Sequence, residues 1–305
     1  MRARLGRLVV ALVMTVGLAG PAYAGNIYLS GHDILLHSGQ NSYDALILDF
    51  LRGVGTASVI PRASYNISVV GSAVGFGAFT GGPIITGHPS GTVLANGAGA
   101  LAGYGTVTYY VTGTGASWTT ILAADALVIL DHTSCGGCDL SNAGSTEVNS
   151  HSAEIATRFN AGMDIWGGSG ASLGTYYDFL PPGAVASGLP IGGSSGFDCT
   201  APGAAIGITG SAGGTCPGSP SMINGFPTHN RFTGFSPAFT VFEVRPQPGA
   251  AAEVISIGLQ GGTITDGGII TDGGGTKVPQ PATLALLGLG LTGLAALGRR
   301  ARAKK

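Results

Sequence analysis

Side chains with acid–base or metal-binding chemistry directly follow three short apolar runs of this chain. In chain order they are His32 with Asp33, Asp131 with His132, and Ser169. In an open parallel sheet, ligands bind outside the carboxyl ends of the strands. If the three runs form neighbouring strands, these side chains converge on one crevice. We therefore predict a ligand-binding site that contains His32, Asp33 and Asp131.

A hydrolytic interpretation of this site centres on Ser169. Gly167-Gly168-Ser169-Gly170 resembles a nucleophile elbow, in which small residues let a serine hydroxyl project from a tight turn. Such a serine needs a base and an acid that orients the base. The candidates are His132 or His229 as base and Asp131 or Glu243 as acid. Ala171 stands where the full elbow pattern has glycine, and a serine in a Gly-rich turn is also common without catalysis.

A metal site is the second interpretation. His32, Asp33 and His37 lie within six residues, and Asp131 and His132 are available to join them. Imidazole with carboxylate suits zinc or another divalent ion, which is the one cofactor that the sequence suggests. The alternative is that these polar groups satisfy backbone donors in Gly-rich loops.

Aromatic residues near Ser169 also have two interpretations. Trp166, Tyr176, Tyr177 and Phe179 could line a sugar-binding cleft, but core packing is the favoured explanation. His88 and His151 are expected on the surface, without a functional role.

The apolar pattern predicts an α/β fold: a mainly parallel sheet flanked by helices, with Gly-rich loops. The chain has 55 glycines in 305 residues, far above the average of about 7%. One helix is expected from Asn41 to Gly55, and a single second helix with Val148, Ser152, Ile155 and Phe159 on one stripe, ending at Gly162. Strands are expected at 26–30, 65–70, 106–111, 126–130, 163–166, 205–209, 239–245 and 253–259. Residues 260–277 repeat Thr-Asp-Gly-Gly and are predicted to be a flexible linker after an ectodomain of residues 25–259.

The order of these elements resembles the class I glutamine amidotransferase-like (flavodoxin-like) group. The residues that carry the resemblance are Gly31-His32-Asp33, Asp131-His132 and the elbow-like 167–171. Amidotransferase-like families have cysteine at the elbow, where this chain has Ser169. The resemblance therefore serves as an indication of fold and not of activity.

Both ends of the chain carry predicted targeting signals. Basic residues at 2, 4 and 7, an apolar run from Leu8 to Gly20 and the small-x-small pattern Ala22-Tyr23-Ala24 predict a signal peptide over residues 1–24. At the other end, Pro279-Gln280-Pro281 precedes an uncharged run over 282–298 and a basic cluster that begins with Arg299 and Arg300. As a helix, that run measures about 25 Å, a marginal membrane span.

This C-terminal order resembles the PEP-CTERM sorting tail that exosortases recognise in bacteria that make exopolysaccharide, with Gln280 where the family has glutamate. The resemblance implies a tail over 278–305, a membrane-anchored precursor, and exosortase, the export machinery and, transiently, the inner membrane as partners. It also implies a destination at the cell surface or in an exopolysaccharide matrix. Such tails also carry an ice-binding label, but we find no flat, regularly spaced threonine or apolar surface.

Charge and cysteine usage agree with export. Between the two terminal signals, six basic and 15 acidic residues give a formal charge of −9, which argues against nucleic acid as a partner. In an oxidising compartment the four cysteines favour two disulfides, with three possible pairings. Because each pair lies in one local loop, we favour Cys135–Cys138 and Cys199–Cys216. Half of a zinc site or a redox pair is the alternative for Cys135 and Cys138.

Together these features predict an exported cell-surface or biofilm-matrix protein with a binding or structural role, and favour a protein that is not an enzyme. The alternative is a hydrolase or amidotransferase-like enzyme that uses Ser169.

Overall fold

We describe the protein from a computed structural model. The described residues are 25–32, 41–56, 59–72, 92–93, 101, 103–132, 140–170, 173–186, 189–191, 193, 195–210, 216, 222–224, 228–265 and 268–270. The predicted signal peptide, the predicted helix over 282–298 and the rest of the sorting tail lie outside them. Within the described part of the chain, no helix combines the length and apolarity needed to cross a membrane.

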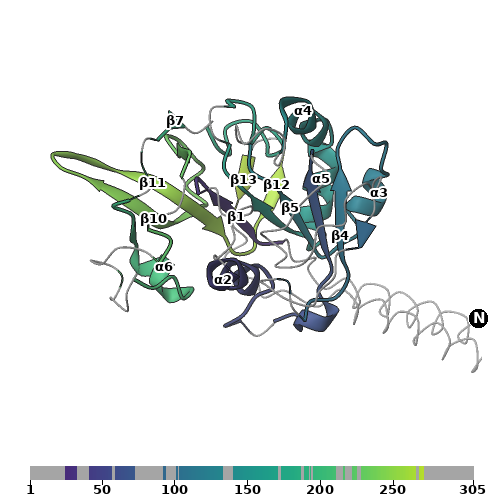
Figure 1. The fold of residues 1–305 in the computed structure, drawn as a ribbon, viewed down its shortest axis with the longest axis horizontal. Coiled ribbons are helices and arrows are strands. Elements are labelled where there is room, and N and C mark those ends of the chain that lie inside the picture. The colour runs from purple at the N-terminus through teal and green to yellow at the C-terminus, as the bar shows by residue number, and fades with distance from the viewer. Residues whose placement is uncertain are drawn as a thin grey trace, which may run out of the picture.

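A nine-stranded sheet forms the centre of the fold (Figure 1), in the order β3-β4-β2-β5-β6-β1-β11-β10-β8. The five strands from β4 to β1 are parallel, and antiparallel strands complete both edges. The strands of this sheet are β1 (Ile27–Ser30), β2 (Ile67–Gly71), β3 (Thr92–Val93), β4 (Val107–Val111), β5 (Ala126–Ile129), β6 (Asp164–Gly167), β8 (Asp198–Cys199), β10 (Thr240–Gln247) and β11 (Ala250–Leu259). The predicted α/β class with a parallel centre is confirmed.

Helices cover both faces of this sheet, which makes three layers. They are α2 (Asn41–Leu51), α3 (Trp118–Ile121), α4 (Asn142–Ser150), α5 (Ser152–Asn160) and α6 (Ala201–Ala205), with a short 3-10 turn at Arg62–Ser64. One core contains Leu127 and Ile129 of β5 with side chains from α3, α4 and α5. The other contains Ala126 and Val128 of the same strand with side chains from α2. Successive strand side chains point to opposite faces, so an unbroken apolar run serves both cores.

The position of β1 separates this sheet from the flavodoxin-like order. In that order, 2-1-3-4-5, the first strand lies between the second and the third. Here β1 lies at the far end of the parallel set, between β6 and β11. The sheet therefore does not confirm the resemblance to the glutamine amidotransferase-like group.

Two predicted elements differ from the structure because local backbone signals outweighed the apolar pattern. The single helix predicted up to Gly162 is divided into α4 and α5 at His151, although Val148, Ile155 and Phe159 still lie buried on one side. The strand predicted at 205–209 is also absent. Thr200 instead begins α6 by accepting a hydrogen bond from the Gly203 N–H (3.1 Å), and proline occupies the first turn.

Part of the predicted linker over 260–277 is folded. Residues Thr263–Thr265 (β12) and Gly268–Ile270 (β13) form an antiparallel pair. Ile264 and Ile269 are buried in the core under α5. The side-chain amide of Asn160 binds the backbone of Ile264 through both its oxygen and its nitrogen, at 2.8 Å each. Residues 263–265 and 268–270 therefore belong to the folded domain, and residues 271–277 lie outside the described residues.

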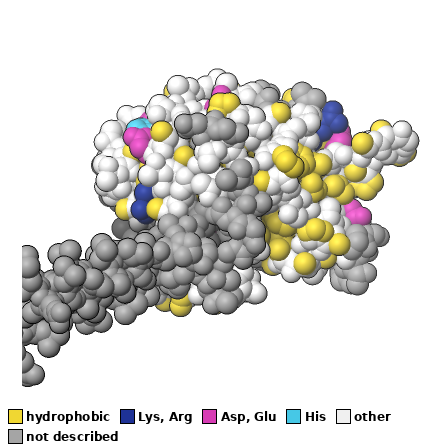
Figure 2. Space-filling model, turned by 180° about the vertical axis from the view of Figure 1, so that it is seen from behind, with side chains coloured by type: hydrophobic (Ala, Val, Ile, Leu, Met, Phe, Trp, Pro, Cys, Tyr) yellow, Lys and Arg dark blue, Asp and Glu magenta, His cyan; other side chains and the backbone are white. Residues whose placement is uncertain are grey.

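The antiparallel edge of the sheet extends beyond the body of the molecule. Strands β10 and β11 form a long hairpin that projects at one side (Figure 1). Hydrophobic side chains gather toward this side on the face shown in Figure 2, where charged groups are few and scattered.

Two further short strands, β7 (Leu189–Pro190) and β9 (Asn230–Arg231), pair with each other and bring residues 228–231 to the carboxyl end of β1.

Candidate functional site

Strands β5, β6 and β1 are parallel neighbours, so the polar residues that follow them meet at one edge of the sheet, as predicted. The backbone N–H of Ser169, after β6, donates to Asp131 Oδ1, after β5. The N–H of His132 donates to the carbonyl oxygen of Ser169 at 2.6 Å. A Cβ atom at Gly168 would lie 2.1 Å from Asp131 Oδ1, so the close approach of these loops requires glycine.

The hydroxyl of Ser169 is held by an amide. It is fully buried and donates to Asn230 Oδ1 at 2.7 Å. The hydroxyl of Tyr177 lies 3.1 Å from the carbonyl oxygen of Gly168 and accepts from the Gly170 N–H at 3.3 Å. Burial raises the pKa of Tyr177 well above its ordinary value, which keeps this phenol protonated. Because Ser169 has one proton to donate, the imidazole contact that an elbow nucleophile needs is replaced by an amide contact.

The two histidines predicted as bases have other contacts. His132 Nε2 lies 2.6 Å from Asn142 Oδ1 at the start of α4. His229 lies beside the end of β1, where its N–H donates to the carbonyl oxygen of Gly31 at 2.9 Å. Sequence spacing placed His132 at a strand end but did not determine which groups the two rings face.

A second polar centre lies at the end of β1 and joins His32, Thr228 and Glu243. His32 Nδ1 is 2.7 Å from Thr228 Oγ1, and His32 Nε2 is 3.4 Å from Glu243 Oε2. The exposed fraction is 0% for His32 and Glu243 and 4% for Thr228. The ring of Phe197 lies edge-on to the imidazole, with 4.9 Å between centroids. The imidazole therefore sits between a hydroxyl and a carboxylate.

Glu243 Oε2 gathers hydroxyl groups from three elements. The hydroxyl of Tyr43 on α2 donates to it, Ser256 Oγ on β11 donates at 2.8 Å, and Tyr28 on β1 lies at 3.4 Å. Burial, reinforced by the negative charge of Glu243, raises the pKa of Tyr28 and Tyr43 well above 10.0. Both phenols therefore stay protonated as donors, and the buried carboxylate is compensated.

Sequence reasoning named His32 and Glu243 but missed Thr228, Tyr28, Tyr43 and Ser256. Glu243 lies on β10, and it reaches these residues because β11 and β10 are added antiparallel next to β1. Thr228 directly precedes His229, which the sequence predicted as a candidate base. No local pattern, however, indicates that residues 196 positions apart form a bridge.

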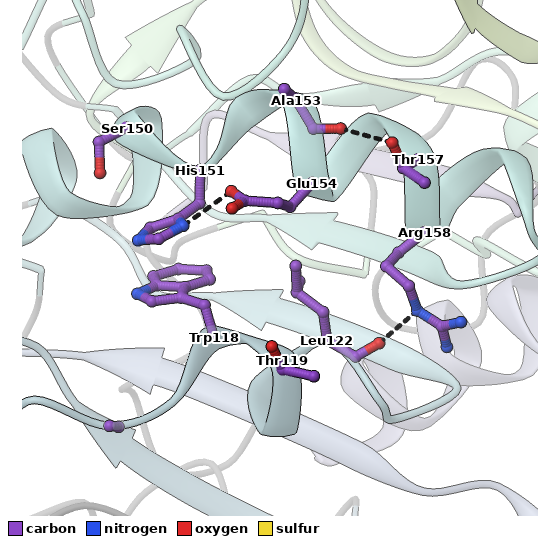
Figure 3. Close-up of a pocket in the computed structure, with 10 residues that line it drawn as sticks. Trp118, Thr119, Leu122, Ser150, His151, Ala153, Glu154, Thr157 and Arg158 are labelled. Atoms are coloured by element: carbon purple, nitrogen blue, oxygen red, sulfur yellow. Dashed lines mark hydrogen bonds and ion pairs between the residues drawn. The ribbon is translucent and has the colours of Figure 1, made fainter.

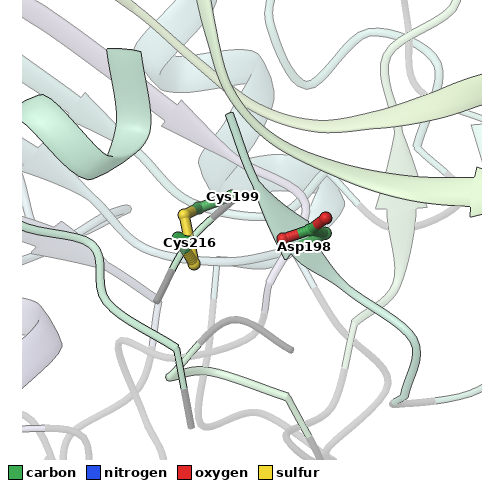
Figure 4. Close-up of side chains that lie close together, drawn as sticks. All are labelled: Asp198, Cys199 and Cys216. Atoms are coloured by element: carbon green, nitrogen blue, oxygen red, sulfur yellow. A yellow bond between two sulfur atoms is a disulfide. The ribbon is translucent and has the colours of Figure 1, made fainter. Parts of the chain in front are cut away.

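The described residues give limited support to the predicted metal set. His32 is buried, with Nδ1 2.7 Å from Thr228 Oγ1 and Nε2 3.4 Å from Glu243 Oε2, whereas Asp33 and His37 lie outside the described residues. Another close group consists of Asp198, Cys199 and Cys216 (Figure 4). Cys199 and Cys216 form a disulfide, as predicted, and disulfide sulfurs are not thiolate ligands. Cys135 and Cys138 lie outside the described residues.

The aromatic residues within and after β6 belong to the core. Exposed fractions are 0% for Trp166 and Tyr176, 3% for Tyr177 and 1% for Phe179. The favoured prediction of core packing is confirmed, and these rings do not line an open cleft.

Comparison with known proteins identifies the C-terminal region. Residues 277–302 match the PEP-CTERM protein-sorting motif, in agreement with the resemblance of the tail. This motif implies an exported, exosortase-sorted protein whose membrane-anchored precursor is processed for the cell surface. No curated protein and no solved structure matches the chain.

Proposed function

We propose that the region between the sorting signals is a non-catalytic cell-surface domain with a binding or structural role, on a protein delivered by exosortase processing. The finer location in an exopolysaccharide or biofilm matrix belongs to this proposal, as does a disulfide between Cys135 and Cys138. Delivery to the surface rests on the sorting motif at 277–302.

The observation that carries the non-catalytic part is the contact of the Ser169 hydroxyl with Asn230 Oδ1 at 2.7 Å. A hydrolase of the predicted type needs that proton to go to an imidazole as the oxygen attacks. Ser169 is also fully buried, so a substrate can reach its hydroxyl only if surrounding residues move. This arrangement suits a hydroxyl that joins two loops.

The test uses a fluorophosphonate probe on the full-length protein and on Ser169→Ala. We expect neither protein to be labelled or to hydrolyse p-nitrophenyl esters, and both to reach the cell surface equally. A chain that lacks residues 278–305 should be exported but should fail to reach its normal destination. Labelling of Ser169 would overturn the non-catalytic role, and normal delivery of the truncated chain would overturn the sorting role.

A second candidate is a hydrolase, and the contacts of His32 favour Thr228 over Ser169 as its nucleophile. His32 lies between the Thr228 hydroxyl and the Glu243 carboxylate, the order of groups that activates a hydroxyl nucleophile. Resemblance to the amidotransferase-like group adds only an indication of fold to this candidate. Ester hydrolysis by the wild-type protein that is lost in both Thr228→Ala and His32→Gln, but kept in Ser169→Ala, would establish it.

A further inference from the structure

An open groove of about 860 Å³ lies between α3 and the start of α5, away from the buried polar centres at the strand ends. Its walls are formed by Trp118, Thr119 and Leu122 on one side and by residues of α5 on the other (Figure 3). The side of α5 contributes His151, Glu154, Thr157 and Arg158, with Ser150 at the end of α4. Ligand pockets typically measure about 300–1,000 Å³, so the groove has room for a small molecule.

Glu154 and Arg158 have the spacing of an ion pair but do not form one. A glutamate four residues before an arginine on a helix normally favours pairing. Glu154 Oε2 instead contacts His151 Nδ1 at 2.8 Å, and Arg158 Nε donates to the carbonyl oxygen of Leu122 at 2.6 Å (Figure 3). The two opposite charges are therefore turned apart along the groove.

Arg158 differs in this respect from the other arginines that the structure describes. Arg52 and Arg62 both bind Asp49, and Arg231 and Arg245 both bind Glu253. Among the described residues, Arg158 makes no ion pair. Its contact with Leu122 uses one of its five N–H donors and leaves both terminal nitrogens for a planar anion such as a carboxylate.

The wall around His151 is held in place before any ligand arrives. The imidazole stacks on the indole of Trp118, with 4.4 Å between centroids and 16° between planes. The indole N–H donates to Glu147 Oε1 at 3.3 Å, which fixes the ring from the other side. His151, held by Trp118, in turn orients Glu154. The Glu154 side chain is 59% exposed.

We propose that this groove binds a small zwitterion, namely an amino acid or a short peptide with a free ammonium and a free carboxylate. Arg158 takes the carboxylate and Glu154 takes the ammonium, while Leu122, Ala116 and Ala153 contact the apolar part. The separated charges favour this class because a simple anion leaves Glu154 unused and a simple cation leaves Arg158 unused. The inference rests on the proposed binding role and names its ligand class.

Isothermal titration of the full-length protein in detergent tests the proposal, with the dipeptide alanyl-leucine as the probe. N-acetylated and C-amidated forms of the dipeptide each remove one charge, and a neutral disaccharide is the third comparison. We expect binding of the free dipeptide and at least about tenfold weaker binding of each blocked form, because each loses one charge-assisted hydrogen bond.

The variants separate the two charges. Arg158→Gln should weaken binding of the free dipeptide by at least about tenfold. The variant should also bind the free and the C-amidated dipeptide equally. Glu154→Gln should likewise weaken binding of the free dipeptide, and it should bind the free and the N-acetylated dipeptide equally. The matched control is Arg62→Gln, which removes an arginine that lies outside the groove and pairs with Asp49.

Equal binding of free and blocked dipeptides, preferential binding of the disaccharide, or no binding of the free dipeptide at millimolar concentration would each overturn the zwitterion site. These outcomes are distinct from failure of the proposed function. Surface delivery and fluorophosphonate labelling are measured on the same proteins and do not depend on occupancy of the groove.

Discussion

The polar centre around Glu243 and the groove around Arg158 use charged side chains in opposite ways. In the centre, one buried carboxylate oxygen is surrounded by Tyr43, Ser256 and His32 from separate elements. In the groove, the exposed carboxylate of Glu154 and the half-buried guanidinium of Arg158, four residues apart, do not meet. The first arrangement satisfies buried groups, as a folded core demands, and the second leaves charge available to a ligand.

This difference indicates where to look for recognition on the molecule. At the described strand ends, polar side chains contact protein groups: Asp131 accepts from the Ser169 N–H, and His32 contacts Thr228. The groove lies on helices that attracted no functional prediction from sequence.

Glu243→Ala should give the largest loss of stability, about 3–5 kcal/mol in the free energy of unfolding. The substitution leaves the donors of Tyr43 and Ser256 buried without their acceptor. Urea unfolding monitored by tryptophan fluorescence measures the change, with Glu154→Ala in the groove as the control. A loss below about 1 kcal/mol would show that the contacts of Glu243 do not stabilise the fold substantially.

Alkaline pH should destabilise the protein through the same centre. The pKa of Tyr28 and Tyr43 is raised in the folded state by burial and by Glu243, whereas an unfolded tyrosine loses its proton near 10.0. The folded state therefore holds more protons above that pH, and its stability falls as pH rises further, by up to about 1.4 kcal/mol per pH unit for each tyrosine.

Unfolding by urea between pH 8 and 11 checks this slope, and Tyr43→Phe should make it shallower. Tyr104, whose pKa burial raises to about 12, provides a comparison outside the centre. Tyr104→Phe should also reduce the slope, because this phenol likewise keeps its proton in the folded state above pH 10. A slope unchanged in Tyr43→Phe would contradict a buried, protonated Tyr43.

Gly168→Ala should destabilise by about 1–3 kcal/mol because the added methyl group overlaps Asp131. Its Cβ would meet Asp131 Oδ1 at 2.1 Å and the Asp131 backbone nitrogen at 3.0 Å. Gly234→Ala is the matched control, since its nearest contact is the Cβ of Ala186 at 3.3 Å. Thermal unfolding of the two variants should differ clearly, and equal midpoints would mean that the two strand-end loops can separate easily.

Arg158→Gln should have the smallest effect on stability, within about 0.5 kcal/mol, while it weakens dipeptide binding. The guanidinium donates one hydrogen bond to a carbonyl and makes no ion pair among the described residues. Urea unfolding and titration on the same sample compare the two effects. A stability loss as large as that of Glu243→Ala would remove the contrast between the two regions.

Much of the central sheet could be predicted from local sequence. The unbroken run Ala126–Ile129 indicated a strand buried on both faces, and the polar residues after β1, β5 and β6 indicated a shared edge. Predictions failed where a short signal competed with an apolar pattern. At Thr200 a capping hydroxyl and Pro202 produced a helix, and at Ile264 and Ile269 a Gly-rich repeat concealed two core residues.

The candidate sites show a similar division. Ser169 and Asp131 were correctly placed together, but the partner of the Ser169 hydroxyl, Asn230, belongs to a segment 61 residues away. His151 was expected to have no role because a lone surface histidine carries no pattern. Its stack on Trp118 joins two helices that the sequence gives no reason to pair.

The sequence by itself determined the sorting of this protein, because the sorting motif at 277–302 is a linear pattern of consecutive residues. It also determined which runs become strands, since apolar periodicity is local. Only the tertiary structure decided which polar groups face one another and which stay exposed. Those contacts join residues far apart in sequence, and their geometry is fixed by the packing of whole layers and not by neighbours in the chain.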